Sequence, residues 1–365
     1  MTVPFLDLAR ETARLRPELD AAIDRVLASG RFVLTSEGEV FEQAFAAYCN
    51  AAESIGVASG TDAITIALIA SGVKPGDEVI TVPNTCIPTI VGIERAGAVP
   101  VLADVDPITY TLDPEQAERR ITGRTKAILS VHLYGQTADL GALRLIAEER
   151  GLLLVEDCAQ SHGASSDGHR AGSVGIASAF SFYPTKNLGA IGDGGGVVTS
   201  DVSVATQARL LRNYGERGRF EHVLHGFNSR LDALQAAVLS VKLTHLDAAN
   251  ERRREIARLY DAELADTPLV RPVTAPGNEH VFHLYVVQST DRDSFRARLD
   301  DAGVGTAIQY PTPVHRQAAY RELDVPGGFP VSEMLAERIV SLPLSADHTD
   351  DEIREVVAAA QSASR

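Results

Sequence analysis

One lysine lies in the most distinctive stretch of the chain, Phe180-Ser-Phe-Tyr-Pro-Thr-Lys-Asn-Leu-Gly. The apolar residues before Lys186 are typical of a strand, and a glycine-rich turn follows it. A primary amine in a partly apolar pocket has a lowered pKa, and only the neutral amine attacks a carbonyl group. Lys186 is therefore a candidate for an imine with an aldehyde cofactor, although a lone lysine is more often a solvated surface residue.

A second candidate site is Ser59-Gly-Thr-Asp-Ala, which follows an expected strand and opens an apolar helix. Backbone N–H groups at a helix N-terminus, joined by the hydroxyl of Thr61, suit a phosphate group. The alternative is that Thr61 only caps the helix.

Two carboxylates, Glu156 and Asp157, end the apolar run Leu152-Leu-Leu-Val. They lie at the C-terminal end of an expected parallel strand, the edge at which open α/β sheets bind ligands. One carboxylate there could keep a pyridine nitrogen protonated, and a protonated ring withdraws electrons from a carbanion beside the imine. A helix cap or a structural ion pair is the alternative.

Other chemistries have weaker support. Cys158 and His162 could suggest a thiol nucleophile, but no oxyanion motif accompanies them. Gly192-Asp-Gly-Gly-Gly precedes a strand instead of a helix, which favours a tight turn over a dinucleotide site. The histidines and cysteines lack zinc-ligand spacing, so we expect no metal site.

Alternating strands and helices must position these residues. The expected strands cover 55–58, 78–82, 99–104, 126–131 and 152–156, and the expected helices cover 61–71, 86–96, 114–121 and 139–150. This rhythm predicts an α/β fold, with a mostly parallel sheet and helices on both faces. Strands at 177–182 and 195–199 follow without a helix between them, so they should pair locally around the lysine.

The flanking segments are expected to be largely helical. Before the sheet, helices fit 14–29, ended by Gly30, and 37–49. Residues 230–264 form one long helical pattern, and 265–280 read as a linker. Strands at 281–287 and 305–310 and helices at 293–302, 331–340 and 350–362 predict a smaller α+β domain. We expect a large domain at 1–250 and a small one at 251–365.

Composition excludes some classes of protein. The net charge of −15 argues against nucleic-acid binding, which needs a basic surface. No basic segment followed by an apolar run opens the chain, and the apolar window 63–70 is too short to span a bilayer. Three cysteines are too few for a disulfide framework. We expect a cytoplasmic protein with neither nucleic-acid nor membrane partners.

Basic residues nevertheless gather in one segment. The segment from Arg209 to Arg230 contains, with both ends included, five arginines and two histidines, against only two glutamates. The segment is either a solvated loop or an anion site for a small phosphorylated ligand.

In chain order, the helix start at 59–61, Asp157 and Lys186 resemble the fold-type I pyridoxal-phosphate enzymes, and more closely the sugar aminotransferases of the DegT/StrS family. The similar segments are Pro4-Phe-Leu-Asp-Leu, Ser59-Gly-Thr-Asp-Ala, Gly76-Asp-Glu-Val-Ile, Val131-His-Leu-Tyr-Gly, Glu156-Asp-Cys-Ala-Gln-Ser-His-Gly, Phe180-Ser-Phe-Tyr-Pro-Thr-Lys-Asn, Arg212-Asn-Tyr-Gly and Asn228-Ser-Arg-Leu-Asp-Ala-Leu-Gln-Ala-Ala. The resemblance implies a large domain with a mostly parallel seven-stranded sheet and a smaller α+β C-terminal domain.

The resemblance also implies roles around the cofactor, pyridoxal 5'-phosphate. Lys186 would form the imine and later move the proton, and Asp157 would pair with the pyridinium nitrogen. Gln160 would contact the phenolic oxygen of the ring. Cys86 stands where the family usually has a stacking aromatic residue, so it could contact the ring but not stack on it. His225 replaces a lysine that close relatives tend to carry, so an anion contact there would be weaker and pH-dependent.

For the cofactor phosphate, the resemblance implies contacts from Gly60, Thr61 and Ser181. Asn228 would reach the phosphate from the neighbouring subunit, which implies a homodimer with its active sites at the interface.

For the substrate, the resemblance implies a nucleotide-diphosphate keto-6-deoxyhexose, most simply dTDP-linked and aminated at C3. An amino acid, L-glutamate by resemblance, would first convert the cofactor to pyridoxamine 5'-phosphate. We expect Tyr183, Tyr310 and His315 near the hexose, and Arg219 and His222 near the diphosphate. C4 amination and a non-catalytic regulatory role are the alternatives, whereas Lys186 argues against the related dehydratases, which carry histidine at that position.

Overall fold

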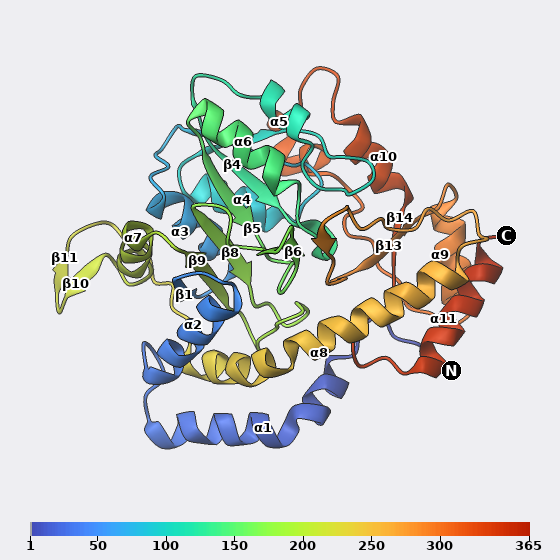
Figure 1. The fold of residues 1–365 in the computed structure, drawn as a ribbon, viewed down its shortest axis with the longest axis horizontal. Coiled ribbons are helices and arrows are strands. Elements are labelled where there is room, and N and C mark those ends of the chain that lie inside the picture. Colours follow the sequence, from blue (N-terminus) through green and yellow to red (C-terminus); the bar gives the residue numbers. More distant parts are fainter. Residues whose placement is uncertain (1) are drawn as a thin grey trace.

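A seven-stranded sheet forms the centre of the larger part of the chain (Figure 1). In the computed structural model, which describes residues 2–365, six of these strands run in one direction, and β9 runs antiparallel to both its neighbours. In spatial order the strands are β1 (Glu53–Val57), β9 (Gly195–Thr199), β8 (Ala177–Ser181), β5 (Leu153–Asp157), β4 (Thr125–Val131), β2 (Glu78–Thr81) and β3 (Val99–Leu102). The predicted mostly parallel sheet and the local pairing of β8 with β9 are both confirmed.

Helices cover both faces of the sheet (Figure 1). One face carries α3, α4 and α7, and the other carries α2, α6 and the first half of α8. The helices of this part are α1 (Leu8–Ser29), α2 (Ser36–Tyr48), α3 (Gly60–Ala70), α4 (Ile87–Arg95), α5 (Pro114–Arg119), α6 (Leu140–Arg150), α7 (Val202–Arg212) and α8 (Ala233–Glu263). The first helix ends as predicted at Gly30, which has a φ of 63°, but it begins earlier, where Asp7 caps it.

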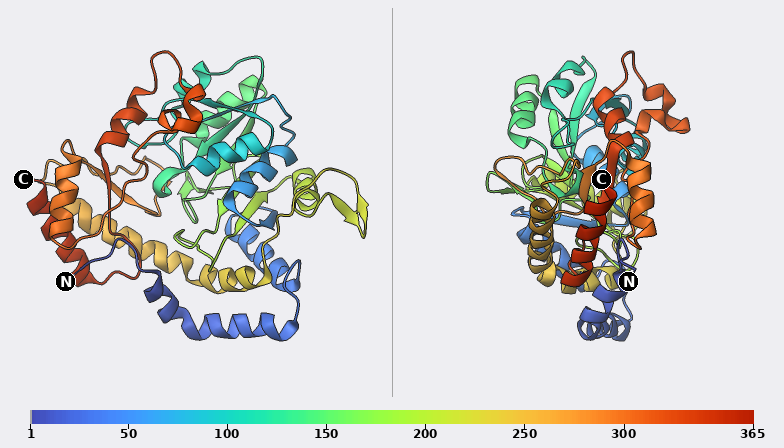
Figure 2. Two further views of the ribbon diagram at one scale, coloured as in Figure 1. Left: turned by 180° about the vertical axis from the view of Figure 1, so that it is seen from behind. Right: turned by 90° about the vertical axis from the view of Figure 1, so that its right-hand side faces the viewer.

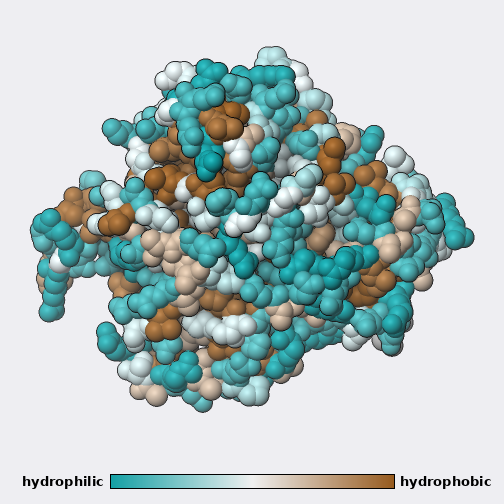
Figure 3. Space-filling view, in the orientation of Figure 1, coloured by the Kyte–Doolittle hydropathy of each residue, from teal (hydrophilic) through white to brown (hydrophobic). Residues whose placement is uncertain are grey.

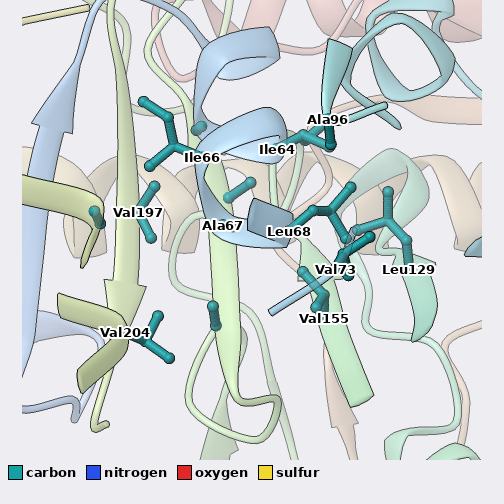
Figure 4. Packing of buried hydrophobic residues seen from close by; sticks show 14 of the residues in the cluster. Ile64, Ile66, Ala67, Leu68, Val73, Ala96, Leu129, Val155, Val197 and Val204 are labelled. Carbon is teal, nitrogen blue, oxygen red and sulfur yellow. The ribbon is translucent and has the colours of Figure 1, made fainter. Parts of the chain in front are cut away.

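Helix α3 lies at the centre of the main core (Figure 4). Ile64, Ile66 and Leu68 are all buried, and they pack in one cluster with Val155 of β5 and Val197 of β9. A helix that is apolar around its whole surface must be covered on all sides. Its N-terminus is therefore held rigidly at the carboxyl ends of β5 and β8.

The C-terminal part has its own core, built on an antiparallel pair of strands. Its elements are β13 (Tyr285–Gln288), β14 (Ile339–Leu342), α9 (Arg292–Asp301), α10 (Pro330–Arg338) and α11 (Asp350–Ala363), together with the second half of α8. Val3 pairs with Val304 and packs into the same core. Accordingly, the N-terminal segment and the C-terminal helix lie at the same end of the molecule (Figure 2).

Three elements of this part differ from the prediction. The helix expected at 331–340 ends at Arg338, and the residues after it form β14, because the β-branched and apolar run Ile339–Leu342 pairs with β13 and is fully buried. The strand expected at 281–287 begins only at Tyr285, because residues just before it donate to the backbone of 134 and 135 instead. In the expected strand 305–310, only residue 307 makes a bridge, to β14.

A hairpin projects from the body of the protein at the left of Figure 1, formed by β10 (Glu216–Gly218) and β11 (Glu221–His222). Figure 3 shows brown, apolar surface on this projection, where Phe220 is 79% exposed and Val223 44% exposed.

The remaining elements are short and link the larger ones. They are β6 (Ser165–Ser166), β7 (His169–Arg170), β12 (Asn278–Glu279) and the 3-10 helices η1 (Leu133–Gly135), η2 (Val314–Arg316) and η3 (Ala318–Leu323). Within residues 2–365, no helix has both the length and the apolar character needed to cross a bilayer.

Candidate active site

A cavity of about 320 Å³ opens at the carboxyl ends of β4, β5 and β8, beside the N-terminus of α3. It is lined by eight of the residues predicted for the site: Gly60, Thr61, Cys86, Asp157, Gln160, Ser181, Tyr183 and Lys186. A second cavity, of about 480 Å³, shares Cys86, Gln160, Tyr183 and Lys186 with the first and is also lined by Tyr310. The two cavities therefore meet at the lysine.

Lys186 follows β8 in a tight loop, in which its N–H donates to the carbonyl oxygen of Tyr183 at 2.9 Å. Of the described residues that line the first cavity, only Lys186 carries an amine. Loss of solvent around this amine lowers the pKa of Lys186, while Cys86 and Asp157 act in the opposite direction. A lowered pKa increases the fraction of neutral amine, the form that attacks carbonyl carbon.

Asp157 is 4% exposed and is held in place from two sides. Its Oδ1 accepts from the N–H of Ala159 at 3.1 Å, and its Oδ2 accepts from the hydroxyl of Thr89 at 2.9 Å. Because the Thr89 hydroxyl donates to Asp157, it accepts from Thr85, whose Oγ1 lies 2.8 Å away. Burial raises the pKa of Asp157, so a cation in this cavity would gain by pairing with its charged form.

Glu156, the neighbouring carboxylate, faces the opposite side of the sheet, as alternation along β5 requires. Its two oxygens accept from the N–H groups of residues 172, 174 and 175 and contact Nε2 of His132 at 2.9 Å. Since Nδ1 of His132 accepts from the N–H of Ala138, Nε2 carries the hydrogen and donates. Burial acts to raise the pKa of Glu156, but these hydrogen bonds outweigh burial and leave it lowered.

His132, Glu156 and Cys158 bring potential metal-ligand atoms within 4.8 Å of one another. The spacing of these residues in the sequence did not suggest this cluster. The carboxylate of Glu156 already accepts four hydrogen bonds, so we interpret the cluster as the structural network that holds β5 in place.

The start of α3 forms a cradle of hydrogen-bond donors. Ser59, not Thr61, caps the helix, since its hydroxyl accepts from the N–H of Asp62 at 3.1 Å. The Thr61 hydroxyl and the first N–H groups of α3 are therefore left for the cavity, which the Ser181 hydroxyl also lines. This arrangement suits a phosphate group.

The cradle depends on Gly60 having no side chain. A Cβ at Gly60 would lie 2.6 Å from the Cβ of Ser181, so Gly60→Ala must push α3 and β8 apart. We expect this change to weaken pyridoxal-phosphate binding by about 1–3 kcal/mol, the usual cost of overpacking. Equilibrium titration of the cofactor measures the effect. The matched control is Gly38→Ala, where no atom lies within 4 Å of the added Cβ. Equal affinities for the two variants would contradict the cradle.

Gln160 and Tyr310 are joined across the two cavities. The Gln160 Oε1 accepts from the N–H of Tyr134 at 2.7 Å, so its Nε2 is the donor, and it donates to the Tyr310 hydroxyl at 3.2 Å. Burial raises the pKa of Tyr310 well above its ordinary value, so the phenol is neutral near pH 7. The thiol of Cys86, which precedes α4, is exposed toward both cavities.

Four predicted site residues lie away from both cavities in this chain. His315 is buried, and its Nε2 lies 3.0 Å from Oε1 of Glu333. Arg219 and His222 belong to the projecting hairpin, and Asn228 is exposed near its base. The hexose contact of His315 therefore remains a prediction, as do the contacts of the other three, which would require a second subunit.

The arginine-rich segment does not form a free basic patch. Sequence reasoning missed α7, on which Arg209 and Arg212 pair with Glu53 and Glu42. Arg217 pairs with Glu221, and Arg230 donates to Oδ1 of Asn213 at 2.9 Å. Among residues 2–365, Arg219 has no ion-pair partner, and its guanidinium lies 5.1 Å from the centre of the Phe220 ring.

The alternative chemistries lose their support in the structure. Cys158 is buried in the core, which raises the pKa of its thiol well above the ordinary value, and His162 lies among phenylalanine rings, where burial lowers its pKa to about 3. In the glycine run, a Cβ at Gly195 would lie 2.3 Å from the carbonyl oxygen of Ser59. That glycine therefore permits the start of α3 to approach β9.

Several site residues were missed from the sequence. Thr85 and Thr89 lie on either side of Cys86 and were given no role in the prediction. His132 belongs to one of the segments that resemble the family, but it too was given no role. Arg253 and His283 line the second cavity although they lie on α8 and just before β13. The ends of β4 and β5 were the one signal that could have suggested His132.

Comparison with known proteins agrees with this geometry. The model of the DegT/DnrJ/EryC1/StrS aminotransferase family matches residues 14–361. The chain is 51% identical over 357 residues to the erythromycin biosynthesis sensory transduction protein EryC1 of Saccharopolyspora erythraea, with 95% of this chain and 98% of the relative covered. It is 48% identical over 344 residues to the dTDP-3-amino-3,4,6-trideoxy-alpha-D-glucose transaminase of Streptomyces venezuelae, with 94% and 91% covered.

A solved structure is also similar over the whole chain. The crystal structure of S. venezuelae DesV in complex with a ketimine intermediate matches with a TM-score of 0.97 at 46% identity. The match covers 100% of this chain and 99% of that one.

Proposed function

The chain belongs to the DegT/DnrJ/EryC1/StrS aminotransferase family, and from this premise we propose that it is a pyridoxal-phosphate-dependent transaminase of nucleotide-linked keto-6-deoxyhexoses. One observation carries the proposal: a single cavity contains the amine of Lys186, the buried carboxylate of Asp157 and the open N-terminus of α3. Those groups match the aldehyde, the ring nitrogen and the phosphate of this cofactor.

The described residues that line the first cavity offer the groups that this cofactor needs. Gly60, Thr61 and Ser181 would hold the phosphate, in a cradle that a Cβ at position 60 would fill. Asp157 would hold the ring at its nitrogen, and Gln160 would hold it at its phenolic oxygen. When bound, pyridoxal phosphate supplies a carbonyl carbon that amines attack and a ring that withdraws electrons from the adjacent carbon.

The protein's own residues then have separate tasks. Asp157 would keep a proton on the ring nitrogen, because a buried carboxylate with two fixed donors is best balanced by a cation. Lys186 would hold the cofactor through its aldehyde, and its amine, when free, could carry a proton. Gln160 and the neutral Tyr310 orient groups between the two cavities.

For the substrate we propose C3 amination of a dTDP-linked keto sugar. The similar S. venezuelae protein is a dTDP-3-amino-3,4,6-trideoxy-alpha-D-glucose transaminase, and the match covers 94% of this chain and 91% of the relative. L-Glutamate is the proposed donor, with pyridoxamine 5'-phosphate formed between the two half-reactions. Amination at C4 by the same residues is the alternative, because the position of the sugar in the second cavity decides which carbon faces Lys186.

We further propose that the protein is a cytoplasmic homodimer whose sites lie at the subunit interface. The projecting hairpin supports this, because Phe220 is 79% exposed at its tip and unpartnered apolar surface favours association. In such a dimer, Asn228, Arg219 and His222 would reach the other subunit's cavity.

The decisive test uses the pyridoxamine-loaded enzyme and a panel of 3-keto and 4-keto nucleotide sugars. We expect the cofactor's visible absorbance to return with the dTDP-linked 3-keto-6-deoxyhexose and to return much more slowly with the 4-keto isomers. If a 4-keto sugar is converted faster than the 3-keto sugar, the enzyme aminates C4 and not C3.

A regulatory role is favoured by one observation: the S. erythraea relative is named a sensory transduction protein. A protein without catalysis has no chemical need for Thr61, Asp157, Gln160, Ser181 and Lys186 around one cavity. The two roles separate when the pyridoxal-phosphate form is mixed with L-glutamate. If no pyridoxamine form appears with this or any other amino acid, the regulatory role is supported.

Arg219→Ala and His222→Ala test capture of the sugar diphosphate. Removing either side chain should raise the KM for the nucleotide sugar by about 10-fold, because only the sugar substrate carries a diphosphate. The donor half-reaction should be unchanged. Arg217→Ala, on the same hairpin but paired with Glu221, is the control. A slower donor half-reaction with an unchanged sugar KM would instead place the hairpin's role in the subunit interface.

A further inference from the structure

Arg253 is a buried arginine without a carboxylate partner. It lies on α8 and is 8% exposed. Its Nη1 donates to the carbonyl oxygens of Phe282, His283 and Leu344, at 3.2, 3.5 and 3.0 Å. Across residues 2–365, Arg253 makes no salt bridge and its Nε and Nη2 donate no hydrogen bond, although a guanidinium carries five N–H groups. One edge of the group is thus left for a ligand.

The free edge belongs to a residue that lines the second cavity. Arg253, Lys186, Gln160 and Tyr310 all line this space of about 480 Å³, and no acidic residue is among the described residues that line it. The arginine therefore shares a cavity with the amine at which donor and acceptor must react.

The charge of Arg253 persists at neutral pH. Burial lowers its pKa to about 10, whereas Glu11 and Asp347, which line a neighbouring small cavity with Arg253, act to raise it. Those two carboxylates already pair with Lys242 and Arg14. A buried cation without a counter-ion is costly unless a ligand supplies the negative charge. Since the described residues that line the second cavity supply no negative charge, a ligand that meets Arg253 there is expected to be an anion.

We propose that Arg253 binds the α-carboxylate of the amino-acid donor, an inference that rests on the proposed transaminase function. A guanidinium edge matches the two oxygens of a carboxylate. Every amino-acid donor carries this carboxylate next to the amine that must reach the cavity of Lys186. The keto sugar carries no carboxylate beside its reacting carbon, so its half-reaction does not require this charge.

The cofactor phosphate and the sugar diphosphate are weaker alternatives for this arginine. Arg253 is absent from the residues that line the first cavity, where Gly60, Thr61 and Ser181 form the phosphate cradle. A diphosphate carries more charge than one guanidinium balances, and Arg253 is the only arginine among the described residues lining the second cavity.

The first measurement is of binding, without turnover. Glutarate has the carboxylates of glutamate but no amine, so calorimetric titration into the pyridoxal-phosphate form reports anion binding alone. We expect Arg253→Met to weaken glutarate binding by about 10- to 100-fold, and Arg253→Lys to weaken it less because the charge remains. Arg252→Met is the matched control, since Arg252 precedes Arg253 on α8 but pairs with Asp350 and Glu255.

The second measurement separates a donor contact from a structural one. In single-turnover reactions, Arg253→Met should raise the KM for L-glutamate and reduce its preference over 4-aminobutyrate, which lacks the α-carboxylate. The keto-sugar half-reaction of the pyridoxamine form should stay within a factor of about three of wild type. If Arg253→Met does not fold, the same measurements are made on Arg253→Lys. The lysine side chain keeps the positive charge and can still donate to one of the carbonyl oxygens that Arg253 contacts.

Three outcomes would overturn the proposal. They are no glutarate binding to the wild type, equal glutarate affinity for wild type and Arg253→Met, or equal slowing of both half-reactions, which indicates a structural role. Failure of the proposed function looks different, because the wild-type protein would then convert no amino-acid donor at all.

Discussion

Replacing Lys186 by alanine is expected to lower transaminase turnover by about 10⁴-fold or more, because one side chain both holds the aldehyde and moves the proton. Of the described residues that line the first cavity, only Lys186 carries an amine, so no neighbour can take its place. The cofactor should bind non-covalently in the variant. Borohydride treatment followed by denaturation should leave the cofactor attached to the wild type and release it from Lys186→Ala.

Lys186→Arg is the control for charge and volume. Arginine keeps the cation, but it does not lose its proton in a protein and so cannot attack a carbonyl. We therefore expect it to be as inactive as the alanine variant. An Arg or Ala variant with wild-type turnover would falsify the role of Lys186 and, with it, the mechanism. Wild-type melting temperatures for both variants would show that the loss is chemical.

Asp157→Asn is expected to keep the fold and the attached cofactor and to slow both half-reactions by about a thousandfold. The amide oxygen can still accept from Thr89 or from the N–H of Ala159. The amide cannot, however, carry the negative charge that keeps a proton on the ring nitrogen. Stopped-flow measurement of each half-reaction tests this, because the ring acts in both.

Glu156→Gln is the natural comparison, since it changes the next carboxylate along β5. Glu156 faces away from the cavity and binds His132 and three backbone N–H groups, so its loss should lower the free energy of unfolding and not the rates of the folded enzyme. If Asp157→Asn stays within a factor of about three of wild type, the ring nitrogen has another partner.

The two variants illustrate how alternation along one strand separates chemistry from stability. Asp157 lines the cavity with Lys186 and Gln160, whereas Glu156 joins β5 to β4 through His132. Adjacent carboxylates at the end of a strand are equivalent in sequence, but their side chains point to opposite faces of the sheet. From the sequence, Asp157 was preferred by resemblance alone, and the pleat gives the physical reason.

The sequence by itself determined the elements and the residues nearest the chemistry. Strong local signals, such as short apolar runs between helical patterns, placed the seven strands within a few residues and located Lys186 beside β8. Local signals were weaker where partners far along the chain decide the structure. Residues 339 and 340 were predicted as the end of a helix, and their pairing with β13 makes them part of a strand. Helix α7 was not predicted, although Val204, Ala208 and Leu211 recur at helical spacing and are buried in the core.

Only the tertiary structure decided which residues share the cavity and what each side chain is free to do. Ser59 caps α3, which leaves the Thr61 hydroxyl for a ligand, and Thr89 crosses from α4 to hold Asp157. Arg253 lies far from Lys186 in the chain and was not singled out from the sequence, yet the two line one cavity. The physical reason is that hydrogen-bond partners and burial depend on contacts between distant segments, which composition and spacing do not record.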